Sequence, residues 1–158
     1  MEEGRRGLLS GATGMSRFLV CEDGGEYTGR FTRFLSGEFE FVRAACFAQA
    51  LPLLPSCSGL LLDLDFRRTA PALLVDESGS PAPASSAEIQ GILILRALRK
   101  SGWRMPVLLF ADFDDPGRAA RLEAELSPLQ VIASSEGLPA IAALLRKMSA
   151  NHERDRQG

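Results

Sequence analysis

Short apolar runs alternate along this chain with segments whose apolar residues recur every three or four positions. The short runs are typical of buried strands and the periodic segments of amphipathic helices. The predicted strands are 17–21, 39–43, Gly59–Asp63, 106–111 and 129–133, and the predicted helices 26–36, 47–54, 85–102, 114–126 and 138–148. Strands and helices that alternate in this way, joined by right-handed crossovers, predict an α/β fold with one doubly wound parallel sheet.

Two of the predicted strands end in carboxylates. The first runs into Glu22 and Asp23, and the third ends at Asp63. Because the carboxyl ends of parallel strands border one crevice, we expect these acids to form one acidic cluster. Carboxylates held close together repel each other unless a proton or a hard cation lies between them, so the pattern predicts a divalent metal site. The alternative is that the acids cap helices or follow strands into solvent.

The connection after the third strand is unusually long. Residues 67–84 hold three prolines and a Ser-Gly-Ser turn, and we call this segment the insertion. Its apolar stretch 72–75 predicts either a short extra strand or a hydrophobic lid, and Ser85 to Glu88 then form a capping box that starts the next helix. The insertion is either a partner-docking element or a tolerated surface loop.

Composition narrows the class of function. The net charge is −2 and no run of Lys or Arg is present, which argues against nucleic-acid binding. Three cysteines without metal-type spacing favour buried thiols in a reducing compartment. No apolar stretch has the length of a membrane span and no signal peptide is evident, so we expect a cytoplasmic protein without membrane contact.

The two ends of the chain differ from its centre. Residues 1–15 lack periodicity and predict a flexible extension, with Met1 and Met15 both open as the true start. Residues 16–149 form the expected domain, and 150–158 a polar tail that contains the only histidine, His152.

Several short motifs together resemble the receiver domain of bacterial two-component response regulators. They are Phe-Leu-Val-Cys-Glu-Asp ending at Asp23, Leu-Leu-Asp-Leu-Asp around Asp63, and the helix and strand within 92–109. The resemblance covers about 17–148 and implies a flavodoxin-like sheet with strand order 2-1-3-4-5 and an insertion after the third strand. It also implies a role in signal transduction, in which Asp63 corresponds to the phospho-acceptor. Glu22, Asp23, Asp63 and the carbonyl of Asp65 correspond to ligands of Mg²⁺.

Other residues that the resemblance requires are missing. The Thr or Ser at the end of the fourth strand is replaced by Ala111, and the Lys at the end of the fifth by Ala133 or Ser134. We therefore expect an atypical receiver, or pseudo-receiver, without a normal phosphorylation switch. Such a module acts by docking onto a protein such as a histidine kinase or a downstream regulator, or onto a second copy of itself. The resemblance places the docking face on the last two helices and the strand between them, about 118–147.

Two alternatives concern the same acids. Asp63 and Asp65 after an apolar strand also resemble the Asp-x-Asp motif of haloacid-dehalogenase-type phosphatases, with 114–115 as their late acid pair. Arg67 and Arg68 are candidates for a phosphate clamp in place of the missing Lys. The simpler expectation for both arginines is a solvated loop.

Overall fold

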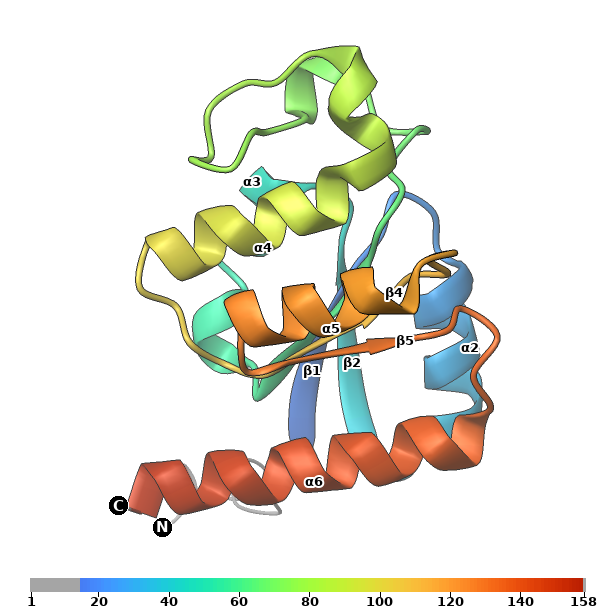
Figure 1. The fold of residues 1–158 in the computed structure, drawn as a ribbon. Helices are drawn as coiled ribbons and strands as arrows, with labels where there is room; N and C mark the ends of the chain where they lie inside the picture. The colour runs from blue at the N-terminus through green and yellow to red at the C-terminus, as the bar shows by residue number, and fades with distance from the viewer. Residues whose placement is uncertain (1–14, 158) are drawn as a thin grey trace, which may run out of the picture.

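The protein is built around one five-stranded parallel sheet. This computed structural model describes residues 15–157, and side chains as far as 154. The strands are β1 (Ser16–Cys21), β2 (Phe39–Ala44), β3 (Gly59–Asp63), β4 (Val107–Phe110) and β5 (Leu129–Ile132). Their order is β2-β1-β3-β4-β5, and every neighbouring pair is parallel (Figure 1). The predicted strands, their order and the doubly wound topology are confirmed.

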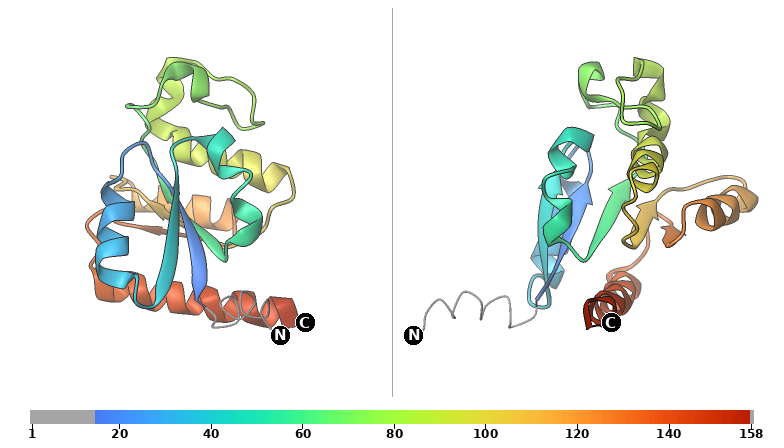
Figure 2. Two further views of the ribbon diagram at one scale, coloured as in Figure 1. Left: turned by 180° about the vertical axis from the view of Figure 1, so that it is seen from behind. Right: turned by 90° about the vertical axis from the view of Figure 1, so that its left-hand side faces the viewer.

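Helices cover both faces of the sheet. They are α2 (Glu26–Leu35), α3 (Phe47–Ala50), α4 (Gln90–Lys100), α5 (Pro116–Glu125) and α6 (Leu138–Gln157), with short 3-10 turns η1 (Leu54–Ser56), η2 (Pro71–Leu73) and η3 (Ala84–Ile89). One apolar core joins the sheet to α2 and α6, and a second joins it to α3, α4 and α5. The insertion and α6 lie on opposite sides of the molecule (Figure 2).

Successive side chains of β3 point to opposite faces of the sheet, so this strand contributes to both cores. Leu60 and Leu62 pack into the core under α4, whereas Leu61 packs into the core under α6, and all three are fully buried. A strand with apolar side chains on both faces belongs at the centre of a parallel sheet. β3 accordingly lies between β1 and β4, so its last residue, Asp63, emerges at the middle of the sheet edge.

The insertion is a folded element. Its 72–75 stretch forms no extra strand of the sheet: η2 is followed by a single antiparallel bridge between Val75 and Pro81. Leu74 and Val75 are buried in the core under α4, whereas Leu73 is 45% exposed. The tip turns at Gly79, whose φ of +86° favours glycine.

Three predicted boundaries are corrected. The helix predicted over 47–54 is shorter, because α3 ends at Ala50 ahead of Pro52 and a separate 3-10 turn, η1, begins at Leu54. The segment that begins at the predicted capping box has no side-chain cap, and Ala84–Ile89 is a 3-10 turn that leads into α4 at Gln90. The expected polar tail continues α6 as far as Gln157, because no Gly or Pro interrupts it and its polar residues tolerate helix. Residues 1–14 of the expected extension lie outside the described part of the chain.

One buried cation holds together the loops before β4 and β5. The Arg99 guanidinium donates hydrogen bonds of 2.8–3.1 Å to four backbone carbonyls, those of Trp103, Met105, Leu126 and Pro128. Burial, followed by the nearby charge of Arg104, lowers the pKa of Arg99 to about 10.

None of the described helices has the length and hydropathy needed to cross a membrane.

Candidate functional site

Acidic side chains gather beyond the carboxyl ends of β1 and β3, as the sequence predicts. Cys21, the last residue of β1, pairs in register with Leu62, so Glu22 and Asp63 follow at the same level of the sheet. Five residues line a hollow of about 320 Å³ at this edge: Asp23, Asp63, Asp65, Arg67 and Arg68. Three of the four predicted metal ligands therefore share one site, and two arginines share it with them.

Glu22 lies apart from this group and caps a helix. Its carboxylate accepts hydrogen bonds from the backbone N–H groups of Tyr27 (3.1 Å) and Thr28 (2.8 Å) and from the Thr28 hydroxyl (2.7 Å). These N–H groups belong to the first turn of α2, which has no intrahelical acceptors for them. Glu22 is only 1% exposed, and the hydrogen bonds of its carboxylate all go to residues of the first turn of α2. Both carboxylate oxygens of Glu22 are thus engaged by α2, which counts against the expected role of Glu22 as a metal ligand beside Asp23 and Asp63.

Arg68 lies directly on Asp23. Its backbone N–H donates to Oδ2 of Asp23 (2.8 Å) and its Nη2 to Oδ1 (3.1 Å), so both carboxylate oxygens are engaged. The same guanidinium forms two further hydrogen bonds of 3.1 Å with the Glu26 carboxylate, which hold the pKa of Glu26 well below its usual range. The Asp23 side chain is only 4% exposed beside this partner. Arg68 therefore belongs to the acidic site through these contacts, although its side chain is still 60% exposed, as expected for a solvated loop.

Arg67 engages the next acid in the same manner. Its backbone N–H donates to Oδ1 of Asp65 (2.8 Å), and its Nε and Nη2 lie 2.7 and 2.6 Å from Oδ2. Within the described part of the chain, the Asp63 carboxylate accepts a hydrogen bond only from the N–H of Leu64, at 2.9 Å, and pairs with no arginine. Burial is the largest cause that raises the pKa of Asp63 from 3.8 to about 6, and the charges of Asp23, Glu22 and Asp65 raise it further.

These contacts do not fit the predicted Mg²⁺ site. Among the described residues, no three His, Cys, Asp or Glu side chains are grouped so that they could hold a metal ion. The carboxylate oxygens of Asp23 and Asp65 already accept hydrogen bonds from arginines, and Glu22 faces α2. At this edge of the sheet, the positive charge next to Asp23 and Asp65 comes from Arg68 and Arg67.

The ends of β4 and β5 carry no group suited to a phosphoryl oxygen. Ala111 is buried and offers only a methyl group. The next residue, Asp112, accepts hydrogen bonds from the backbone N–H (3.0 Å) and the hydroxyl of Ser134, which keeps its pKa low. Ala133 is exposed. The Asp112–Ser134 pair, which sequence reasoning did not foresee, ties together the loops after β4 and β5.

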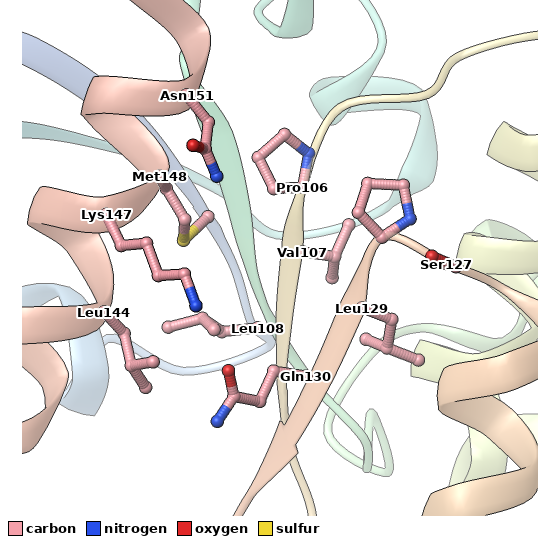
Figure 3. A pocket seen from close by; sticks show the side chains of 11 residues that line it. Pro106, Val107, Leu108, Ser127, Leu129, Gln130, Leu144, Lys147, Met148 and Asn151 are labelled. Carbon is pink, nitrogen blue, oxygen red and sulfur yellow. The ribbon is translucent and has the colours of Figure 1, made fainter.

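A second hollow lies at the opposite ends of β4 and β5. It has a volume of about 280 Å³ and is lined on one side by α6 and on the other by the first residues of both strands (Figure 3). Among the described residues that line it, Lys147 is the one with a charged side chain, and Gln130 of β5 faces it. The hollow borders the segment 118–147, which the resemblance marks for partner docking.

Comparison of structures finds proteins with the same fold, whereas comparison of sequences finds no match. No family model matches the chain, and no curated protein matches its sequence. Among solved structures, the receiver domain of Francisella response regulator 1452 aligns with a TM-score of 0.60 at 17% identity over 89% of this chain and 98% of that one.

Two further receiver structures match comparably. The signal receiver domain of a putative LuxO repressor protein from Vibrio parahaemolyticus has a TM-score of 0.65 at 8% identity, covering 90% of this chain and 96% of that one. The beryllofluoride-activated receiver domain of Klebsiella pneumoniae RstA has a TM-score of 0.60 at 16% identity, over 84% and 97%. With its parallel sheet in the order β2-β1-β3-β4-β5 and acids beyond β1 and β3, the chain has the fold of response-regulator receiver domains.

Proposed function

We propose that this chain is an atypical receiver that takes part in signal transduction by docking onto a protein partner, without a phosphorylation switch at Asp63. The observation that carries the proposal is the chemistry beyond β4 and β5. Buried Ala111 stands where receivers place a hydroxyl, and either exposed Ala133 or Ser134, which is hydrogen-bonded to the Asp112 carboxylate, stands where they place an ammonium group. The partner class is a histidine kinase or a downstream regulator, with a second copy of the chain as the other candidate.

Electrostatics supports the same conclusion. A phosphoryl group on Asp63 would lack two charge-assisted hydrogen bonds, each worth roughly 1.5–3 kcal/mol. It would also add negative charge to a region that is already acidic. The pKa of Tyr27 is raised, first by burial and then by the charges of Asp63, Asp112 and Glu22, so all three acids act on one phenol. An acyl phosphate at Asp63 is therefore poorly stabilised. Ala111 also has no hydroxyl that could move toward the phosphoryl group.

The experiment treats the protein with acetyl phosphate, and separately with beryllofluoride, in the presence of Mg²⁺, and follows backbone amides by NMR. We expect the amides of Ala111 and Gln130 to keep their shifts, because no side chain there responds to charge at Asp63. Asp63→Asn is the control for labelling of that residue by acetyl phosphate. Strong labelling together with large shifts at Ala111 and Gln130 would contradict the proposal.

The phosphatase alternative has no contact in its favour. An Asp-x-Asp enzyme uses its second acid for proton transfer, yet Asp65 is held by the side chain and backbone of Arg67. Asp115 of the predicted late pair caps α5 through the N–H of Gly117. Turnover of p-nitrophenyl phosphate that disappears in Asp63→Asn would support the enzyme instead.

A further inference from the structure

The Arg68 guanidinium lies beside Gly24, where there is no side chain to obstruct it. Gly24 lies against the guanidinium: a Cβ at this position would lie 2.4 Å from Nη2 of Arg68 and 2.1 Å from Oε1 of Glu26. Such distances are far below van der Waals contact, so the ends of the Arg68 and Glu26 side chains would have to shift to make room for any larger residue at position 24. The absence of a side chain at Gly24 therefore makes room for the arginine.

The backbone around Arg68 is fixed as well. Phe66, two residues earlier, is fully buried, and its N–H donates to the carbonyl of Ala87 at 2.9 Å. The N–H of Thr69 then closes a turn onto the carbonyl of Phe66 at 3.0 Å. Arg67 and Arg68 lie within this turn, and both use their own N–H groups to bind an acid. The start of the insertion is thus attached to the acidic site by backbone as well as by charge.

The charge balance of the site follows from these contacts. The hollow is lined by three carboxylates and two guanidinium groups, so its formal charge is −1 (−3 + 2) when all are ionised. A divalent cation gains its binding energy from several oxygen ligands and a strong negative potential. Both are diminished here, because the arginines bind oxygens of Asp23 and Asp65 and offset half of the negative charge once Glu26, which shares Arg68, is counted (−4 + 2 = −2).

We propose that Arg68 is a built-in counter-ion that replaces the divalent metal at the acidic site. The site is consequently independent of metal, and a bound cation and the seated Arg68 exclude one another. The inference rests on the proposed function and deepens it, because it names Arg68 as the group that sets the charge around Asp23 and Asp63.

The test is a Mn²⁺ titration, followed by paramagnetic broadening of the amides of residues 22–24 and 63–65 and by thermal unfolding. Wild type should show weak broadening and an unchanged melting temperature. In Arg68→Gln we expect Mn²⁺ to bind at least about tenfold more tightly, because one opposing charge is removed and Oδ1 of Asp23 loses its guanidinium partner, whereas Oδ2 keeps the backbone N–H. Mn²⁺ should also restore part of the thermal stability that this variant loses.

Two further variants keep the result interpretable. Arg121→Gln removes the same charge from an exposed pair with Asp115 and should behave as wild type. Gly24→Ala keeps every charge but displaces the guanidinium, so it should gain Mn²⁺ binding even if Arg68→Gln does not fold. Equal affinity in wild type and Arg68→Gln, or no gain in either site variant, would overturn the inference. No phosphoryl donor is present, so this outcome is separate from the labelling test above.

Discussion

Single acids in the site differ in how their charge is compensated. Glu22 is stabilised by the first turn of α2, and Asp23 by Arg68. Asp63 has neither kind of partner among the described residues, since its one hydrogen bond comes from the N–H of the next residue. Its environment is therefore dominated by burial and by neighbouring negative charge, which is why its pKa rises whereas that of exposed Glu26 falls.

The raised pKa of Asp63 predicts how stability depends on pH. Its folded value of about 6 exceeds its ordinary 3.8, so the folded state favours the protonated form. The folded state holds this proton more tightly, so stability from this group is present at low pH and falls as pH rises through 6. Asp63→Asn removes that loss, and we expect it to raise the unfolding free energy at pH 8 by about 1–2 kcal/mol, after allowance for solvent screening.

Chemical denaturation of both proteins between pH 4 and pH 8 measures this effect. The difference in unfolding free energy between the Asp63→Asn variant and wild type should shrink toward zero near pH 4. Asp114→Asn, which removes the same charge from an exposed loop, is the control and should show no such trend. A stabilisation that is independent of pH would point to packing at Asp63 and not to its charge.

At the level of elements, the insertion owes its order to one buried amide. Gln90, the first residue of α4, is 1% exposed. Its Oε1 accepts from the N–H of Val75 (2.8 Å) and its Nε2 donates to the carbonyl of Val75 (3.0 Å), so the side chain pairs with the insertion as a neighbouring strand would. The long loop is in this way attached to the core through backbone groups that would otherwise be buried without partners.

Gln90→Met tests this attachment with little change in side-chain volume. The N–H and carbonyl of Val75 would both lose their partners, and each unsatisfied buried group costs roughly 1–3 kcal/mol. We expect lower stability and faster hydrogen exchange at Val75, together with proteolytic cleavage within 71–84. Amides of β3, such as that of Leu61, are the reference, and their exchange should change only as much as global stability does. Unchanged protection of Val75 would show that burial of Leu74 and Val75 orders the insertion by itself.

At the scale of the whole molecule, the insertion presents an apolar residue to solvent. Leu73 is 45% exposed at the end of η2, and the insertion lies on the side of the molecule opposite α6 (Figure 1). Deleting the insertion would remove buried Leu74 and Val75 from the core, at about 1.5–3 kcal/mol for each. A substitution on its surface is therefore a better probe of docking than a deletion.

Leu73→Asp should weaken capture of a protein partner if the insertion is the docking element. Immobilised wild type and variant are compared in a pull-down from extracts of the source cells. Phe34→Asp is the control, since Phe34 is 58% exposed on α2, which covers the other face of the sheet. Melting temperatures confirm that both variants fold. Equal capture by Leu73→Asp and wild type would direct attention to the α5–β5–α6 face and its hollow beside Lys147.

Strand addition at the β5 edge is already hindered. The outward-facing N–H of Val131 donates to the Glu123 carboxylate at 2.9 Å, so this edge donor is not free to pair with another strand. Strand pairing with a second copy of the chain at this position of β5 would therefore have to displace the Glu123 carboxylate.

Local patterns in the sequence were sufficient to predict the architecture of this protein. Apolar runs of strand length and periodic helical segments can be recognised without a structure, and right-handed crossovers leave few ways to assemble them. The same logic placed Asp23, Asp63 and Asp65 at one edge, because parallel strands end together. Ala111 and the missing Lys were evident by position alone.

How those acids are used depends on tertiary contacts. Whether Glu22 faces a metal or the first turn of α2 is a matter of side-chain direction, which no spacing specifies. Two arginines at the start of a long loop look like solvated residues until the fold brings Asp23 within 3.1 Å of Arg68, a residue 45 positions away along the chain. Charge compensation depends on distance in space, and for this reason the identity of the cation at the acidic site followed from the fold and not from the pattern.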